Sequence, residues 1–317
     1  MADMQHSAAM PAEELRPEDF APLTQHASQA NAEADRPALG YWKDAWLRFK
    51  KDKIAMLALA VIVFLILVAI FGPVLSGVSY ADQDLAQANQ GPSAAHWFGT
   101  DNLGRDLFIR VLYGARISLS IGIVASLLNF LIGVTYGGIA GFAGGKVDRV
   151  MMNIVDVLYS VPMLLYVILL MVVLKPGLIN IFIALGIAYW LPMARIVRGQ
   201  ILSMKEQEFV LAARTIGASK RRILMKHLIP NTIGAIVVTL SLSIPDAIFT
   251  EAFLSFIGLG VSAPMASWGV LASEGITSLK VYPFQLFFPA LAISVTMLAF
   301  NFLSDGLRDV LDPKMRR

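Results

Sequence analysis

The chain has 317 residues, of which 56% are apolar and only 15% are charged, and its mean hydropathy is +0.64. Soluble domains are roughly a quarter charged, so this depletion of charge excludes an ordinary soluble protein. The formal net charge is only +3, and we expect no nucleic-acid partner; the lack of cysteine excludes disulfides, thiolate chemistry and cysteine-ligated metal.

The first 40 residues differ in kind from the rest of the chain. They contain seven acidic residues against only two basic ones, Arg16 and Arg36, and they are rich in Ala and Pro. This segment has no apolar core of the signal-peptide type. We therefore expect residues 1–40 to form a disordered, acidic cytoplasmic tail.

Six later segments are apolar enough to cross a membrane. A helix needs about 20 apolar residues to cross a hydrocarbon core of about 30 Å, and only a helix satisfies its own backbone in lipid over such a length. We expect the spans at Ile54–Val74, Ile117–Ala140, Val150–Leu174, Leu178–Met193, Thr232–Phe256 and Phe284–Leu303. The sequence therefore predicts an all-α membrane protein with six transmembrane helices.

Basic residues are distributed unequally between the two sides of these spans. Segments 41–53, 141–149, 194–231 and 304–317 together contain 19 Lys and Arg residues. The segments on the other side contain only five, which are Arg105, Arg110, Arg116, Lys175 and Lys280. Because Lys and Arg concentrate in cytoplasmic loops, we expect both termini and the segment 194–231 to be cytoplasmic.

Residues 41–116 form an N-terminal region that comes before the remaining transmembrane domain at 117–317. A basic, amphipathic stretch at Tyr41–Lys53 precedes the first span, and a long external segment follows it. In that segment, Gly99-Thr100-Asp101 is typical of a turn and a helix cap. Apolar residues at helical spacing come next, at Leu103, Leu107, Val111 and Leu112. We expect an amphipathic helix on the outer surface that leads into the second span.

Glycines recur every four residues where the second span ends, at Gly133, Gly137, Gly141 and Gly145. Small residues at this spacing occupy one helix face and let another backbone approach closely. Two interpretations remain open, an interface that moves during function and plain tight packing.

No signature of catalysis or metal binding is present in the sequence. The four histidines, His6, His26, His96 and His227, have no metal-ligand spacing. Gly144-Gly145-Lys146 is not a phosphate-binding loop, because no Ser or Thr follows the lysine. No nucleophile elbow occurs either. We expect no catalytic residue, no metal site and no cofactor in this chain, which is therefore not expected to be an enzyme.

The polar segment Glu206–Asn231 is the most informative part of the sequence. Residues Gln207–Ile216 favour a short helix with Phe209, Ala212, Ala213 and Ile216 on one face. Gly217 is suited to the positive φ that ends such a helix, and Ser219 to the cap of a second helix. That second helix has a polar face of Lys220, Arg221, Arg222 and Lys226 and an apolar face of Ile223, Leu224 and Leu228. We expect Pro230 to end it before the fifth span.

This segment resembles the coupling loop by which permeases of ATP-binding-cassette (ABC) importers bind their ATPase subunits. The family pattern is Glu-Ala-Ala, three residues, Gly, nine residues and Ile-x-Leu-Pro. The matching positions are Leu211, Ala212, Ala213, Gly217, His227, Ile229 and Pro230. Leu211 departs from the expected Glu, whereas the spacing of Ala-Ala, Gly and Pro is kept. The plain alternative is a loop whose basic residues bind anionic lipid headgroups.

Three further stretches narrow the resemblance to the C-type permease subunit of peptide and nickel importers. They are HWFGTDNLGRDLFIRVLYGARISL at His96–Leu119, TEAFLSFIGLGVSAPMASWGVLASEG at Thr250–Gly275, and DGLRDVLDPKMR at Asp305–Arg316. With the coupling loop and the basic stretch, the similarity covers about residues 40–317. The sequence TEAFLSFIGLGV is more similar to the oligopeptide branch of the family than to the dipeptide or nickel branches.

The resemblance implies a type I ABC importer permease fold in the cytoplasmic (inner) membrane. It implies four kinds of partner: a homologous second permease subunit, two ATPase subunits that bind ATP and Mg, an extracytoplasmic peptide-binding protein, and membrane lipid. The implied substrate is a short peptide. The alternatives are a dipeptide or nickel permease, an ion-coupled secondary transporter, and a scaffold subunit.

Two acidic residues of the fifth span are candidates for the translocation path. Asp246 lies midway along the span after Pro245, and Glu251 lies further outward. A carboxylate at this depth normally faces the bundle or a water-filled cavity. For Asp246 the alternative is an interhelical hydrogen bond near a kink, and for Glu251 it is solvation at the outer boundary.

Overall fold

The computed structural model describes residues 40–311, so the acidic tail expected at 1–40 lies outside the described residues apart from Gly40. Within the described range the regular elements are helices. They are α2 (Tyr41–Phe49), α3 (Lys53–Leu75), η2 (Leu85–Gln87), α4 (Leu107–Ala143), α5 (Gly145–Tyr159), α6 (Met163–Leu174), α7 (Leu178–Ala188), α8 (Trp190–Met204), α9 (Glu208–Thr215), α10 (Lys220–Ile223), η3 (Leu224–Leu228), α11 (Ile229–Asn231), α12 (Ile233–Phe256), α13 (Trp268–Thr277) and α14 (Phe284–Leu311).

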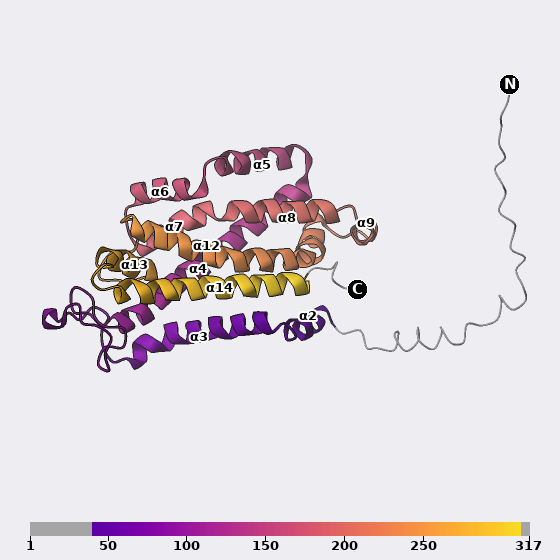
Figure 1. Cartoon of the computed structure of the whole chain (residues 1–317). Helices are drawn as coiled ribbons and strands as arrows, with labels where there is room; N and C mark the ends of the chain where they lie inside the picture. The colour runs from indigo at the N-terminus through magenta and orange to yellow at the C-terminus, as the bar shows by residue number, and fades with distance from the viewer. Residues whose placement is uncertain (1–39, 312–317) are drawn as a thin grey trace, which may run out of the picture. The chain divides into compact units, whose positions relative to one another are not determined.

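The long helices from Ala45 onward pack into one bundle. Figure 1 shows α8, α12, α14 and α3 as a row, and α4 packs against α8, α12 and α3. The helix α9 lies at one end of the bundle and α13 at the other. The chain segments between spans are therefore gathered at two opposite ends.

The prediction of six spans is confirmed if one bent helix pair is taken as a single span. Five segments are long and apolar enough to cross a membrane, at Lys53–Leu75, Leu107–Ala143, Leu178–Met204, Ile233–Phe256 and Phe284–Leu311. The sixth is the pair α5 and α6, which is bent by 81°. The prediction of one unbroken span at Val150–Leu174 was therefore wrong. Pro162 stands directly before α6, and a proline disfavours a helical backbone at the residue before it.

The helix α3 shows how the first span meets the rest of the bundle. Asp52 caps it, with Oδ1 accepting hydrogen bonds from the backbone of Ile54 and Ala55 at 2.9 and 3.1 Å. Only small or β-branched side chains of α3 are buried, namely Ala55, Ala58, Ile62 and Ala69. The remaining apolar surface of α3 is suited to lipid, because a helix that is apolar on all sides is typical of a membrane span.

A side chain of α4 replaces the backbone hydrogen bond that a proline near the end of α3 cannot donate. Pro73 has no N–H, so the carbonyl of Ala69 loses the helical donor it would otherwise have. The Arg116 guanidinium donates to the carbonyl oxygens of Ala69 at 3.2 Å and Ile70 at 3.0 Å. Arg116 thereby joins α4 to the end of the first span.

The external amphipathic helix predicted to begin near Gly99 is absent from the described residues, and α4 instead runs unbroken from Leu107 to Ala143. Its cap is Asp106, whose Oδ1 accepts from the backbone of Ile109 at 3.0 Å, so a cap at Asp101 was wrong. Leu103 lies in the loop before the helix. Leu107, Val111 and Leu112 of the predicted amphipathic pattern lie in the first turns of a long span.

The glycine repeat of α4 packs against α8. A Cβ added at Gly133 would lie 2.6 Å from Cβ of Met193, and one at Gly141 would lie 2.9 Å from the carbonyl oxygen of Arg198. A Cβ at Gly137 would overlap the backbone of Ala194. Gly145 has open space around it and is not part of this contact. The structure therefore shows tight packing at three of the four glycines.

Candidate functional site

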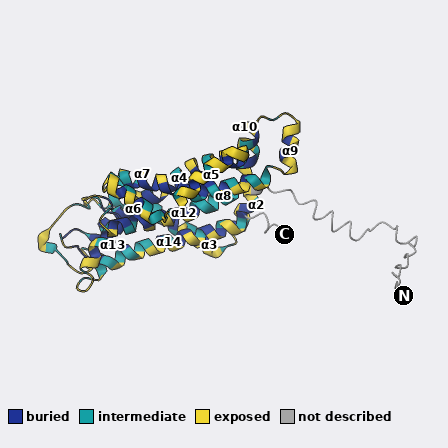
Figure 2. Ribbon diagram, turned by 90° about the horizontal axis from the view of Figure 1, so that it is seen from above, coloured by how far each residue is buried: buried dark blue, intermediate teal, exposed yellow. Residues whose placement is uncertain are grey.

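The polar segment between α8 and α12 forms a compact unit at one end of the bundle. Its first helix, α9, has Val210 fully buried and Ala213 5% exposed. The opposite side of α9 is exposed and apolar, with Leu211 at 45% and Ile216 at 84% exposure. Figure 2 shows α9 as largely exposed. The expected common face of both alanines was wrong, because Ala213 points inward whereas Ala212 is exposed.

The turn after α9 confirms the predictions for Gly217 and Ser219. Gly217 has φ +80°, and its N–H donates to the carbonyl of Arg214 at 3.0 Å. The N–H of Ala218 donates to the carbonyl of Ala213 at 3.0 Å, which closes the end of the helix. Ser219 caps α10, because its Oγ accepts from the backbone of Arg222 at 3.3 Å.

The helix predicted to end at Pro230 ends one residue later, at Asn231, and α12 begins at Ile233. A π-helical stretch covers Leu224–Leu228, and Pro230 lies in the short helix α11 that directly follows it. Asn231 contributes a side-chain hydrogen bond, with Nδ2 donating to the carbonyl of His227 at 2.5 Å. The segment is therefore joined to α12 by a nearly continuous helical path.

Buried apolar side chains hold this segment against the bundle. Residues from α8, α9, α10, η3 and α12 form one cluster, which contains Val197, Ile201, Val210, Ala213, Ile223, Leu228 and Ile236. The basic residues Lys220, Arg221, Arg222 and Lys226 are exposed on the outside. A force applied to the exposed face of α9 would therefore reach α8 and α12 through packed side chains.

Asp246 lies midway along α12 with an exposed side chain. Within residues 40–311 its carboxylate accepts no hydrogen bond and forms no ion pair. Only its backbone carbonyl is engaged, by the hydroxyl of Tyr189 at 3.0 Å. A carboxylate in the middle of a span is costly in lipid, so this face requires water or a second protein.

Glu251 is fully buried, so the interpretation that it is solvated at the outer boundary was wrong. Its carboxylate accepts hydrogen bonds from the hydroxyls of Ser267 at 2.6 Å, Ser255 at 2.7 Å and Ser118 at 3.4 Å. These serines belong to α4, α12 and the cap of α13. Glu251 joins three elements and does not line an open path in this structure.

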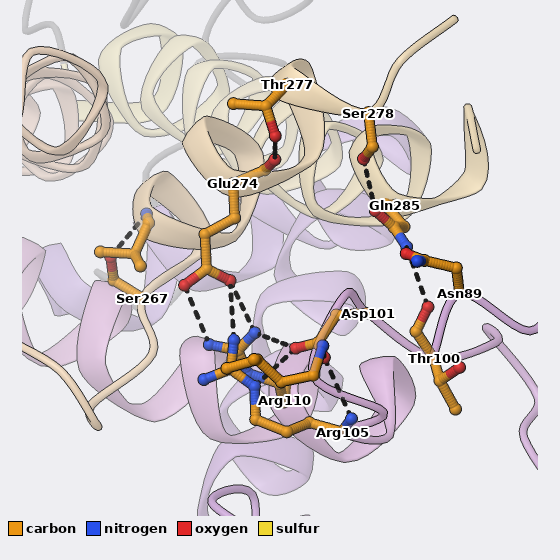
Figure 3. Close-up of polar contacts among 12 residues, drawn as sticks. Asn89, Thr100, Asp101, Arg105, Arg110, Ser267, Glu274, Thr277, Ser278 and Gln285 are labelled. Atoms are coloured by element: carbon orange, nitrogen blue, oxygen red, sulfur yellow. Dashed lines mark hydrogen bonds and ion pairs between the residues drawn. The ribbon is translucent and has the colours of Figure 1, made fainter. Parts of the chain in front are cut away.

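Sequence reasoning also missed a cluster of four charged residues at the α13 end of the bundle (Figure 3). Asp101 accepts from Arg105 Nε and from Arg110 Nη1, both at 2.6 Å. Arg110, only 1% exposed, also donates to Glu274 of α13 at 2.6 Å. No sequence pattern marks this pairing, because Arg110 and Glu274 are 164 residues apart. The cluster fixes α13 to the start of α4.

Two protein families match the chain. Residues 133–317 match the family described as binding-protein-dependent transport system inner membrane component. Residues 40–92 match the family described as the N-terminal transmembrane domain of oligopeptide transport permease C. The first match contains the whole segment Glu206–Asn231.

Curated relatives are similar along nearly the whole chain. The oligopeptide transport system permease protein OppC of Bacillus subtilis is 54% identical over 94% of this chain and 97% of its own length. The dipeptide transport system permease protein DppC of the same organism is also 54% identical, over 95% of this chain and 94% of its own. OppC of Escherichia coli is 46% identical over 87% of this chain and 92% of its own.

A solved structure has the same fold as most of the described bundle. The MetNI methionine ABC transporter in an inward-facing conformation aligns with a TM-score of 0.53 at 17% identity, covering 65% of this chain and 96% of that chain. The fold class predicted from the sequence, a type I ABC importer permease, is confirmed.

Proposed function

This chain belongs to the family of inner membrane components of binding-protein-dependent transport systems, and we propose that it imports short peptides as a permease subunit driven by separate ATPase subunits. It is a transport subunit and not an enzyme. We assign ATP and Mg to the two ATPase partners. A homologous second permease and an extracytoplasmic peptide-binding protein complete the assembly, with both termini of this chain on the cytoplasmic side.

The observation that carries the coupling role is the exposed apolar face of α9. Leu211 and Ile216 project from a helix whose other side is anchored by Val210 and Ala213. Exposed apolar groups on a rigid mount are typical of a protein interface. Ala212 lies on the same outer side and lets the helix seat deeply in a groove of the partner.

The proposed mechanism converts closure of the ATPase dimer into movement of α8 and α12. Closure draws α9 toward the α9 counterpart of the second permease. The packed cluster beneath α9 transmits this displacement to both spans. The two permeases then alternate between inward and outward openings, and no covalent chemistry occurs in this chain.

The exposed acid on α12 supports a place for the translocation path. The carboxylate of Asp246 has no partner within the described residues, and water or the second permease would satisfy it. We propose that Asp246 borders the path. Leu211 occupies the position of the family's usual Glu, so the contact of α9 with the ATPase is mainly apolar in this chain.

Gly217→Val tests the coupling role. A non-glycine residue in the left-handed region costs about 1–2 kcal/mol, and a Cβ at this position meets nothing within 4 Å, so the strain comes from the backbone alone. A cost of this size corresponds to a factor of about 5 to 30. We therefore expect ATP-dependent peptide uptake and co-purification of the ATPase to fall by about this factor, with membrane insertion preserved.

Gly217→Asn is the matched control, because Asn tolerates positive φ far better than Val. We expect it to retain most of the uptake. Normal uptake and normal ATPase co-purification in Gly217→Val would refute the coupling role. Peptide uptake by the purified complex that persists without ATP and without any ATPase subunit would instead support the ion-coupled alternative, and uptake of nickel in place of peptide would support the nickel branch.

A further inference from the structure

A cavity of about 610 Å³ lies between α5 and α8, and neither α9 nor Asp246 lines it. This volume falls within the range of about 300–1,000 Å³ that is usual for small-molecule sites. Five of its lining residues are charged. The full lining consists of Gly145, Asp148, Arg149, Met152, Asn153, Asp156, Arg195 and Arg198.

Two ion pairs cross this cavity and hold its walls together. Arg198 binds Asp148 in a bidentate manner, with Nε and Nη2 donating at 2.5 and 2.6 Å. Arg195 donates to Asp156 at 2.6 Å and lies 4.2 Å from the ring centroid of Tyr159. Arg149 has no ion-pair partner among residues 40–311, so the cavity has both signs of charge and one uncommitted cation.

The charged lining extends along much of α5 and of α8. Asp156 lies eleven residues beyond the start of α5 at Gly145, which corresponds to about 17 Å along a helix axis. Arg195 lies ten residues before Lys205 at the end of α8, or about 15 Å. Each of these distances along a helix equals about half the thickness of a hydrocarbon core. Charges at this depth face a bundle interior or a water-filled cavity.

The surface of α5 separates polar from apolar side chains. Arg149, Asn153 and Asp156 follow one another at helical spacing on the cavity side. The exposed apolar residues form a different stripe, which consists of Val147, Val150, Ile154 and Val157. This separation indicates that the cavity side meets water, whereas the apolar stripe meets lipid or protein.

We infer that this cavity is a water-filled vestibule, open to the cytoplasm, that binds the charged ends of the transported peptide; the inference rests on the proposed peptide import. The peptide carboxylate binds Arg149, and its ammonium group binds Asp156, whose side chain is 58% exposed beside Arg195. The two positions are seven residues apart on α5, about 10 Å. An extended tripeptide spans about 10 Å between its ends.

The lack of cysteine in this chain allows a direct test. In inside-out membrane vesicles that contain the assembled transporter, Asn153→Cys is exposed to small membrane-impermeant thiosulfonates, one with a sulfonate and one with a trimethylammonium group. Ile154→Cys is the matched control, because Ile154 is its exposed neighbour on the apolar stripe. We expect Asn153→Cys to react at least about tenfold faster, with the anionic reagent ahead of the cationic one by the attraction of Arg149.

Two additions test the ligand. A tripeptide with free termini is expected to slow labelling of Asn153→Cys several-fold, whereas the same tripeptide blocked at both ends is not. Arg149→Gln is expected to remove both this protection and the preference for the anionic reagent. Equal labelling of Asn153→Cys and Ile154→Cys would overturn the vestibule, and equal protection by free and blocked peptides would overturn the recognition of charged ends.

A failure of the proposed function has a different signature. Before labelling, the Asn153→Cys transporter is assayed for ATP-dependent peptide uptake. If it imports peptide but shows no selective labelling, only the vestibule is wrong. If unmodified transporter imports no peptide while labelling and protection behave as expected, the vestibule stands and the assignment of peptide import is wrong.

Discussion

The contact between α4 and α8 allows a prediction from two adjacent glycines. Gly137 packs on the backbone of α8, where an added Cβ would overlap the carbonyl oxygen of Ala194 and lie 2.9 Å from its carbonyl carbon and Cα. At Gly138 an added Cβ would meet only side-chain atoms, at 3.8–3.9 Å. Substitution by alanine should therefore lower stability at Gly137 and raise it at Gly138.

Gly137→Ala forces the two helices apart. Carbon atoms prefer separations of about 3.5–4.0 Å, so α8 must retreat by at least about 0.6 Å. Overpacking of this kind costs about 1–3 kcal/mol, and the clash with rigid backbone favours the upper end. The gain of about 1 kcal/mol in helix propensity offsets part of this. We expect a net loss of about 2 kcal/mol for Gly137→Ala and a gain of up to about 1 kcal/mol for Gly138→Ala.

The assay is the thermal unfolding midpoint of the purified transporter in one detergent, with peptide uptake measured per assembled complex. We expect the two variants to differ by several degrees, with Gly137→Ala below the wild type. A stability of Gly137→Ala equal to that of Gly138→Ala would refute the reasoning. A normal midpoint with lost uptake in Gly137→Ala would instead favour an interface that moves during transport.

Two further predictions concern buried polar contacts. Arg116→Met removes the hydrogen-bond donor to the carbonyl of Ala69 and should lower stability by about 1–2 kcal/mol. In a Pro73→Ala background, where a backbone N–H is restored, this loss should fall by about half. A double-mutant cycle on unfolding midpoints that shows no coupling between the two positions would contradict this prediction. Glu251→Gln keeps an oxygen that accepts from Ser255 and Ser267, so it should retain its stability and keep peptide uptake within a few-fold of the wild type. Glu251→Leu leaves those hydroxyls unpaired and should lower stability by about 1–3 kcal/mol. Loss of uptake in a stable Glu251→Gln complex would show that the charge of Glu251 is itself needed.

The spans could be predicted from the sequence because they depend on local composition. Apolar length fixes where a helix can cross lipid. The cytoplasmic position of both termini, expected from the basic residues of short loops, stays a prediction. The turn at Gly217 and the cap at Ser219 were also predictable, since each needs only a residue type at one backbone position. The location of the candidate coupling segment followed from these local rules.

Long-range packing decided the features that the sequence left open. Ala212 and Ala213 have the same side chain, and only the cluster beneath α9 makes one exposed and the other buried. Asp101 accepts hydrogen bonds from the backbone N–H groups of Leu103 and Arg105 in a turn, whereas its other carboxylate oxygen binds the side chains of Arg105 and Arg110, and the helix starts only at Leu107. The bend between α5 and α6 is 81°, and Pro162 by itself does not set this angle.

The sequence by itself determined that this protein is a six-span membrane protein with a structured segment at Glu206–Asn231, because periodicity and charge act over a few residues. The tertiary structure decided which side chains of that segment are available to a partner and which acids of α12 are accessible. Glu251 is enclosed by serines from distant elements, whereas Asp246 is left open. Burial depends on neighbours far apart in the chain, and no local pattern encodes them.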